Sequence, residues 1–205
     1  MTAEYTPRYY RIYRRVSTSM IVTVEDALDL GKVRFTLTRY HKGKGAAASV
    51  EHYMDTPKAA LLAWDLLNTP SAANQRRGEL ALWWNGYTEY KGTHKGSDYT
   101  SRTLQLELAT DSDNPWRITI SNGPGEPVGT NGAIKPKAGA DKETTRVTTV
   151  LPWTDVREMA VTMLICLQSW ATMTYYTRRN AATWQPEPDG DTVTVDRRTG
   201  EILEP

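Results

Sequence analysis

Short runs in which apolar and polar residues alternate dominate the first quarter of the chain. In the run VRFTLTRY, the apolar Val33, Phe35 and Leu37 alternate with polar or basic residues. A period of two predicts a β-strand with one buried face. The run leads into HKGKG, whose glycines favour a hairpin turn. By the same criteria, strands are predicted over residues 9–16, 20–24, 33–40 and 46–54.

A helix is predicted directly after these strands. Thr56 is suited to the N-cap, and Pro57 to the first helical position, where its missing N–H costs nothing. Apolar residues are frequent over residues 61–67, and Asn68 and Pro70 indicate the end of the helix. The first part of the chain is therefore predicted to contain four strands followed by a helix.

A second series of strands is predicted further along the chain. Leu104, Leu106 and Leu108 recur with a period of two, and the run WRITI alternates in the same way. The strands predicted in this part cover residues 79–84, 87–91, 99–110, 116–120 and 145–151.

A Gly- and Pro-rich stretch and a long helix complete this second series. Residues 121–143 are predicted to form a loop, and loops of such length are usually functional or disordered. Asp155 and Glu158 form a capping-box pattern. Apolar residues then follow at helical spacing, which predicts a helix to about residue 179.

The predicted fold class is α+β, with two repeats of a four-stranded antiparallel sheet followed by a helix. The two halves cover about residues 8–69 and 79–179 of a single domain at residues 1–184. Residues 185–205 are polar and contain Pro, Asp and Gly, so we expect a disordered acidic tail there.

Charge and aromatic residues are unevenly distributed. The net charge is +1, but residues 185–205 carry six acidic residues and two arginines. This tail therefore has a net charge of −4, and the first 184 residues have +5. A basic body with an acidic tail is typical of nucleic-acid binders. The chain has 11 Tyr and 7 Trp but 1 Phe, and Tyr and Trp favour surfaces where one edge of the ring meets water.

The sequence offers little for catalysis or for membrane insertion. The one cysteine allows no intrachain disulfide, which fits a reducing compartment. His41, His52 and His94 are scattered, without metal-ligand spacing, and no phosphate-binding loop motif occurs. We therefore expect no enzyme activity, cofactor or metal. No apolar run is long enough to span a membrane and no secretory signal is found, so a cytoplasmic protein of bacterial, phage or mobile-element origin is expected.

Tyrosines and cations occur together in four clusters. The densest, RYYRIYRR at residues 8–15, has four Arg and three Tyr. Strand alternation places its odd-numbered residues, two rings and two cations, on one face, where bases could stack and phosphates be neutralised. The alternative interpretation is an edge strand protected by charge. The predicted nucleic-acid-binding residues are Arg8, Tyr9, Arg11, Tyr13, Arg15, Arg39, Tyr40, Lys42, Lys44, Tyr90, Lys91, Lys95, Tyr99 and Arg102. A fourth cluster, at residues 175–179, is also explained by the helix dipole.

The order of elements and one motif resemble a known family. The segment KGKGAAASV, which begins at Lys42, is similar to the motif Lys-Gly-Lys-Ala-Ala-Leu-Ser-Val of the Whirly proteins, relatives of the PC4-like single-strand binders. Lys42 and Lys44 match the motif lysines, whereas Gly45 is inserted and Ala48 replaces leucine. The similarity in element order covers residues 8–179. It implies a tetramer built around the helices, with single-stranded DNA along the sheet surfaces and little sequence preference.

The predicted function is binding of single-stranded nucleic acid with little sequence specificity, to protect or present single strands in DNA replication, recombination or repair. DNA is favoured, and RNA stays open. One alternative is a single-strand annealing recombination protein, which would assemble into large rings. Another is a protein-binding scaffold, whose binding would be insensitive to salt. The predicted partners are single strands, further copies of the chain in a homo-oligomer, and a protein at the acidic tail.

Overall fold

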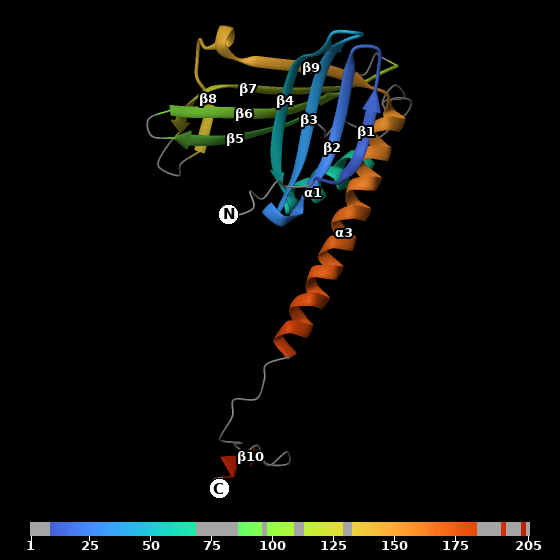
Figure 1. Cartoon of the computed structure of the whole chain (residues 1–205), viewed down its shortest axis with the longest axis vertical. Helices are drawn as coiled ribbons and strands as arrows, with labels where there is room; N and C mark the ends of the chain where they lie inside the picture. The colour runs from blue at the N-terminus through green and yellow to red at the C-terminus, as the bar shows by residue number, and fades with distance from the viewer. Residues whose placement is uncertain are drawn as a thin grey trace. The chain divides into compact units, whose positions relative to one another are not determined.

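The computed structural model describes residues 9–68, 86–95, 98–108, 113–128, 133–183, 194–195 and 202–203 (Figure 1). Its elements, in chain order, are β1 (Arg11–Val16), β2 (Met20–Ala27), η1 (Leu28–Leu30), β3 (Lys32–His41), β4 (Gly45–Asp55), α1 (Thr56–Asn68), β5 (Tyr87–Lys95), β6 (Asp98–Leu108), β7 (Trp116–Val128), β8 (Ala133–Pro136), η2 (Asp141–Glu143), β9 (Thr145–Leu151), α3 (Trp153–Thr183), β10 (Thr194–Val195) and β11 (Ile202–Leu203). The described residues form two larger antiparallel sheets and two α-helices. The predicted α+β class is confirmed.

Sheet 1 consists of β1, β2, β3 and β4 in that order, each antiparallel to its neighbour. The alternation predicted for β3 is confirmed, because Val33, Phe35 and Leu37 are all buried. Phe35 lies between Val24 of β2 and His52 of β4. These residues face the core, and the alternate residues of the same strands form the outer face of sheet 1.

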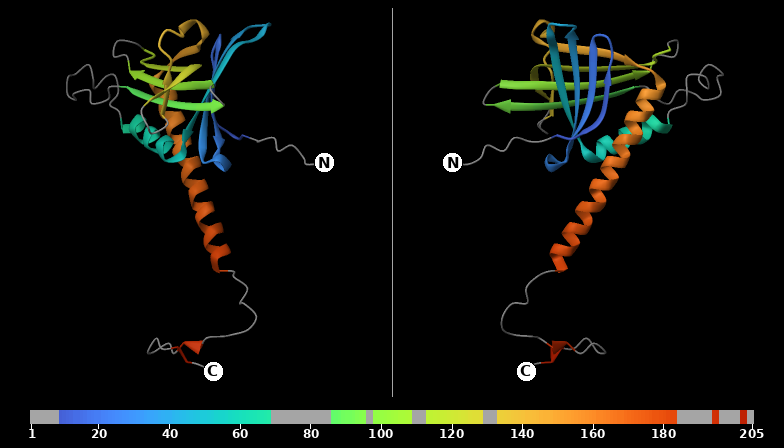
Figure 2. Two further views of the ribbon diagram at one scale, coloured as in Figure 1. Left: turned by 90° about the vertical axis from the view of Figure 1, so that its left-hand side faces the viewer. Right: turned by 45° about the vertical axis from the view of Figure 1, so that its right-hand side comes forward.

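Sheet 2 has the order β5, β6, β7, β8, and β9 also pairs with β7. Its core face carries the buried Leu104, Leu106, Ile118 and Ile120. The strands of the two sheets run across one another, with β4 on the side of sheet 1 nearest sheet 2 (Figures 1 and 2). Contacts join β4 to β6, β7 and β9, so the two sheets meet along this strand.

Each of the two helices follows a sheet in the chain. Helix α1 buries Ala59, Leu62, Ala63 and Leu66 and packs against β3 and β4. Helix α3 begins at Trp153, where the Val156 N–H donates to the Pro152 carbonyl at 3.4 Å. The predicted cap at Asp155 is therefore wrong. Asp155 lies in the first turn, where its charge favours the helix dipole, and forms an ion pair with Arg15.

The predicted loop at residues 121–143 is wrong in its first part. Strand β7 continues to Val128, and β8 then pairs with it antiparallel. Glycine is needed there for close packing: a Cβ at Gly125 would lie 2.6 Å from the side chain of Ile134, and one at Gly92 would lie 2.2 Å from it. Ile134 is buried against these glycines. The glycines thus permit a side chain to pack directly on a strand backbone.

The chain forms two compact units, residues 1–169 and residues 170–205. The first contains both sheets, α1 and the beginning of α3. In the second, Thr194–Val195 pairs antiparallel with Ile202–Leu203. The predicted strand at residues 79–84, the remainder of the predicted tail at residues 185–205, and the predicted site residue Arg8 lie outside the described residues.

Candidate nucleic-acid interface

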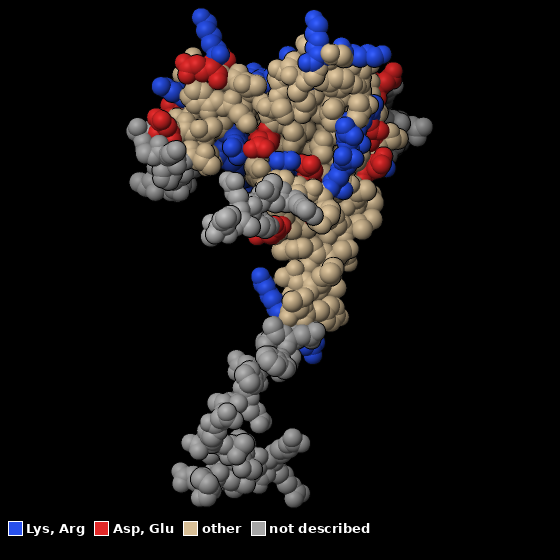
Figure 3. Space-filling model, in the orientation of Figure 1, with Lys and Arg blue, Asp and Glu red and all other residues tan. Residues whose placement is uncertain are grey.

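Charges are segregated along sheet 1. Its acidic residues, Glu25, Asp26, Glu51 and Asp55, lie in the later parts of β2 and β4. The other end of the sheet holds the β1–β2 and β3–β4 turns, and the sequence has no Asp or Glu over residues 5–24 or 30–50. Lys and Arg side chains stand out over the β3–β4 turn, whereas acidic and basic side chains are interleaved lower on the molecule (Figure 3).

We call Arg39, Tyr40, His41, Lys42 and Lys44 the basic tip. The side chains of Arg39, Lys42 and Lys44 are exposed and form no ion pair with any described residue. The tip brings together three cations that the sequence predicted, and they are available to a polyanion.

Hydrogen bonds hold the two turns of this end together. The Tyr40 N–H donates to the Ser19 carbonyl at 2.9 Å, and the Tyr40 hydroxyl donates to the Ser17 carbonyl. Gly43 and Gly45 have φ angles of 79° and 82°, so the β3–β4 turn uses a conformation that other residues rarely adopt. Tyr40 therefore has a structural role, and the cations are presented on a fixed turn.

The first predicted cluster does not form one ring-and-cation face. A bulge between Arg11 and Tyr13 breaks the alternation of β1. The Tyr13 ring is 6% exposed and belongs to the core, and burial raises its pKa. Arg15 forms the ion pair with Asp155, and the Tyr9 ring lies under the Arg34 guanidinium at 4.3 Å. Of the predicted residues here, Arg11 stays exposed, opposite Glu25.

The exposed ring and cation of this segment are two other residues, one just before β1 and one within it. Arg14 is exposed, and the Tyr10 ring is 71% exposed. Both belong to the run RYYRIYRR, whose composition indicated a cluster of rings and cations. The alternation argument assigned them to the opposite face because the bulge at Ile12 has no clear sequence signature.

The predicted cluster on β5 and β6 is divided between the two faces of sheet 2. Lys91 forms an ion pair with Asp55, and Arg102 lies 3.8 Å from Glu51 and 5.7 Å from the centre of the Tyr53 ring. Their charges are therefore compensated at the meeting of the sheets. Tyr99 is half-buried and lines a polar groove with Asp98 and Lys137, and the side chain of Lys95 lies outside the described residues.

Tyr90 is on the opposite, outer face of sheet 2, with its ring 52% exposed. The strand register places Tyr90 beside Thr103, Thr103 beside Ser121, and Ser121 beside Arg146. We call these four residues the outer row of sheet 2. Thr103 and Ser121 are 4% and 8% exposed and therefore buried, whereas Arg146 is exposed. Sequence reasoning missed Arg146, because only the register shows that it shares a row with Tyr90.

A polar network with a buried centre joins sheet 1, α1 and sheet 2, and we call it the sheet junction. It consists of Lys32, His52, Asp55, Lys58, Glu89 and Lys91. His52 is 0% exposed, and its Nε2 lies 3.0 Å from the carboxylate of Glu89, which is 5% exposed. The Lys58 ammonium donates to the other oxygen of Glu89, also at 3.0 Å.

The pKa values of the sheet junction follow from these contacts. Burial alone would raise the pKa of Glu89, but hydrogen bonds from His52 and Lys58 outweigh it and the pKa is lowered. Hydrogen bonds from Lys32 and Lys91 lower the pKa of Asp55 to about 2. Both carboxylates are therefore charged at neutral pH, and they stabilise the contact between the sheets.

Among the described residues, no group of three His, Cys, Asp or Glu side chains is placed to hold a metal ion. Within that same part of the chain, no helix is long and apolar enough to cross a membrane. The candidate site is thus a set of exposed cations and rings on two sheets.

No protein-family model matches this chain. A search of curated proteins also found no match.

Proposed function

We propose that this protein binds single-stranded nucleic acid with little sequence preference, DNA above all. The observation that carries the proposal is the basic tip, where three exposed cations lack carboxylate partners among the described residues. The opposite end of sheet 1 has cations as well, but Glu25, Glu51 and Asp55 compensate them. Unpaired cations release counterions when they meet phosphates, which supplies most of the affinity of non-specific binding.

Exposed rings favour single strands over duplex. Tyr10 and Tyr90 are both more than half exposed, although each belongs to or borders a strand. A ring on a sheet surface can stack on an unpaired base, while a duplex hides the faces of its bases. In the outer row of sheet 2, the exposed groups are the ring of Tyr90 and the cation of Arg146, which could meet a base and a phosphate.

We also propose a Whirly-like, PC4-like fold of two sheet-and-helix repeats. The element order of four strands, a helix, five strands and a helix supports it, as does the motif that begins at Lys42. This proposal includes a homo-oligomer, a tetramer by resemblance. Val161 and Ile165 of α3 support it, since they are 42% and 60% exposed and one helical turn apart.

The function is tested by titrating fluorescent oligo-dT, a matched duplex and a matched RNA at two salt concentrations. We expect the protein to bind oligo-dT more tightly than duplex, with affinity falling as salt rises. Lys42→Gln/Lys44→Gln should reduce the salt slope by about 1.4, at about 0.7 per phosphate contact on single strands. Equal affinity for the duplex would contradict the proposal.

The matched control is Arg117→Gln/Lys135→Gln. This variant removes two surface charges as well, but Arg117 lies 3.3 Å from Glu107 and Lys135 lies 3.2 Å from Glu126. Its affinity should stay close to that of the natural protein. If both variants lose affinity equally, net charge and not the basic tip determines binding.

The oligomer is tested separately by light scattering at micromolar concentration. We expect a mass above that of the monomer, and a shift towards monomer in Ile165→Glu, because a charge at an apolar interface is costly. A monomer at all concentrations would contradict the oligomer and leave the nucleic-acid proposal in place.

A further inference from the structure

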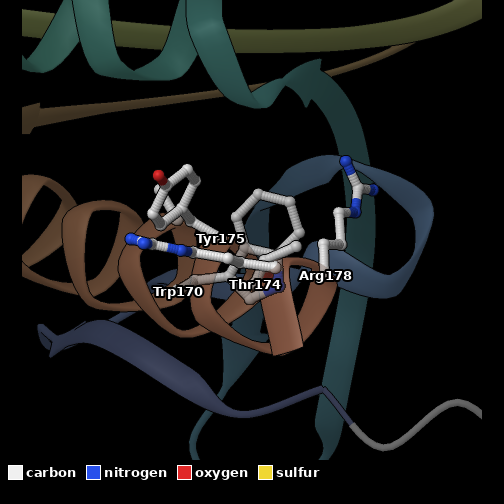
Figure 4. Close-up of a pocket in the computed structure, with 6 residues that line it drawn as sticks. Trp170, Thr174, Tyr175 and Arg178 are labelled. Atoms are coloured by element: carbon white, nitrogen blue, oxygen red, sulfur yellow. The ribbon is translucent and has the colours of Figure 1, made fainter. Parts of the chain in front are cut away.

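Two further groups of rings lie outside the basic tip and the outer row of sheet 2. One is on α3, where Trp170, Thr174, Tyr175 and Arg178 line an open groove (Figure 4). The other is on the outer face of sheet 1, where the ring of Tyr9 already lies against side chains of the sheet. An occupied place shows which kind of group it accepts, so the place held by Tyr9 indicates its own ligand.

Tyr9 lies on a row of polar side chains that crosses three strands. The strand register places Glu25 of β2 beside Arg34 of β3, and Arg34 beside Tyr53 of β4. The Arg34 guanidinium lies over the Tyr9 ring, 4.3 Å from its centre, and a hydrogen bond to the Tyr53 hydroxyl raises the pKa of Tyr9. We call Glu25, Arg34 and Tyr53 the Tyr9 site. It holds a flat ring through a guanidinium plane and a hydroxyl.

The guanidinium of Arg34 is held in a fixed orientation. Its Nε donates to Glu25 at 2.8 Å, and its Nη1 lies 3.6 Å from Glu51. Burial alone would lower the pKa of Arg34, but hydrogen bonds to Glu25 and Tyr53 outweigh it and the pKa is raised. Because the charge of Arg34 is compensated, the site favours a flat neutral group over a phosphate. Of the parts of a single strand, only a base is flat and neutral.

The Tyr9 side chain can leave this site without breaking the sheet. Tyr9 precedes β1, and the ladder between β1 and β2 begins with Arg11 opposite Glu25. The backbone is fixed one residue after Tyr9, where Tyr10 and Asp26 exchange hydrogen bonds of 2.6 and 2.8 Å. Displacement of the Tyr9 ring therefore disturbs neither the ladder nor this pair.

We propose that the Tyr9 site binds a base of the single strand, and that Tyr9 closes the site in the free protein. This inference rests on the proposed function and adds to it a subsite and its regulation. A base of the bound strand displaces Tyr9 and stacks on the Arg34 guanidinium, as unpaired bases do on arginine planes. The Tyr53 hydroxyl, released from Tyr9, can then donate to or accept from the edge of the base.

The outer face of β3 connects this site to the basic tip. Arg34 and Tyr40 are six residues apart on the strand, which corresponds to about 20 Å. Thr36 and Thr38, which are half-buried and uncharged, lie between them on the outer face. A strand whose phosphates are bound at the tip can therefore continue to the Tyr9 site. Its bases then have an effective concentration of about millimolar, which lets them compete with the tethered ring of Tyr9.

The test is titration of fluorescent oligo-dT at two salt concentrations with variants of the full-length protein. Tyr9→Ala opens the site and should tighten binding about threefold. The salt slope should stay unchanged, because no phosphate contact is gained. Tyr9→Phe keeps the ring but loses the bond to Tyr53, so it should tighten binding less. Tyr9→Ala/Arg34→Lys keeps the positive charge without the flat plane and should lose the gain.

Two further variants serve as controls. Tyr175→Ala removes a ring from α3 that is 59% exposed, and it should leave affinity unchanged. Tyr9→Ala/Tyr53→Phe tests the site a second time if the lysine variant does not fold, and it should lose part of the gain. Urea denaturation of every variant shows whether the fold is retained.

The outcomes distinguish this inference from the proposed function. If the natural protein does not bind oligo-dT, the proposed function fails and the Tyr9 site fails as well. If the natural protein binds and Tyr9→Ala binds equally, Tyr9 has only a structural role and this inference alone fails. Weaker binding by Tyr9→Ala would make Tyr9 itself a stacking residue, which also overturns the inference. A gain that persists in both double variants, or that occurs equally in Tyr175→Ala, would remove Arg34 and Tyr53 as the base site.

Discussion

The basic tip and the sheet junction both contain lysines, but the surroundings of these lysines differ. At the tip, Lys42 and Lys44 are exposed and have no ion pair within the described part of the chain. At the junction, Lys32 and Lys91 both donate to Asp55, and Lys58 donates to the nearly buried Glu89. Lysine is thus exposed and without an ion pair in the first region, and a structural residue in the second.

The difference shows what distinguishes a candidate site from a scaffold. Both regions contain lysines and a histidine. Among the described residues, carboxylates compensate the cations of the junction and not those of the tip. Substitutions at the junction should therefore change stability and leave binding unchanged, and substitutions at the tip should do the reverse.

The largest effect, a loss in the free energy of unfolding, is expected at the sheet junction. Glu89→Ala removes a charge that is 5% exposed and leaves the ring of His52 buried without its partner. Breaking a buried pair from one side costs about 3 kcal/mol or more, so the free energy of unfolding in urea should fall by that amount. Glu107→Ala is the control, since its pair with Arg117 is exposed and should contribute less than about 0.5 kcal/mol. Equal losses would remove the distinction between the regions.

The second-largest effect, a loss of affinity for oligo-dT, is expected at the basic tip. Arg39→Gln/Lys42→Gln/Lys44→Gln should weaken oligo-dT binding by about tenfold or more at 50 mM salt, since three phosphate contacts are lost. The urea midpoint should not change, because none of the three side chains forms an ion pair within the part of the chain that the structure describes. Anisotropy titration and urea denaturation on the same preparation measure both quantities. A lower midpoint with unchanged affinity would show that the tip is structural.

A smaller loss of affinity is expected from the outer row of sheet 2. Tyr90→Ala removes a half-exposed ring, and stacking contributes about 1 kcal/mol or more per base. Affinity should fall about fivefold with the salt slope unchanged, since no cation is lost. Tyr13→Phe is the matched control, as that ring is buried and its substitution should leave affinity unaltered. A loss in Tyr13→Phe instead would restore the face first predicted for β1.

The smallest effect is the acid dependence of Asp55. Its folded pKa of about 2 lies below the unfolded value of 3.8. The stabilisation is therefore fully present above about pH 4 and is lost as pH falls towards 2. The side chain is 38% exposed, so solvent screening reduces the contribution to below about 1 kcal/mol. Urea denaturation of Asp55→Asn should differ from the natural protein at pH 6 and converge with it near pH 2; a constant difference would contradict this assignment.

The strands and helices were predictable because their signals are local. The alternation around Phe35 and the Thr56-Pro57 pair each depend on a few neighbouring residues. The compensation of charges was not predictable, because the partners come from distant elements. Arg15 and Asp155 lie on β1 and α3, and Lys91 and Asp55 lie on different sheets. Whether a cation was available to bind could be decided only after the fold was known.

Tyr13 and Tyr90 show that the exposure of a tyrosine also could not be predicted from its neighbours in the sequence. Both tyrosines occur among cations in the sequence. The bulge in β1 turns Tyr13 into the core, whereas the regular register of β5 keeps Tyr90 on the outer face. Local composition identified both rings as candidates, and backbone geometry separated them.

The packing of Ile134 on Gly92 and Gly125 has a consequence for how this sequence can vary. A methyl group at either glycine would collide with the Ile134 side chain, so neither position can change alone. A shorter side chain at position 134 would not make room for alanine at position 92, because the Cβ of residue 134 itself would lie 2.2 Å from the new methyl group. Positions 92 and 125 should therefore stay glycine in natural or selected variants, although they lie in segments whose composition suggests tolerance.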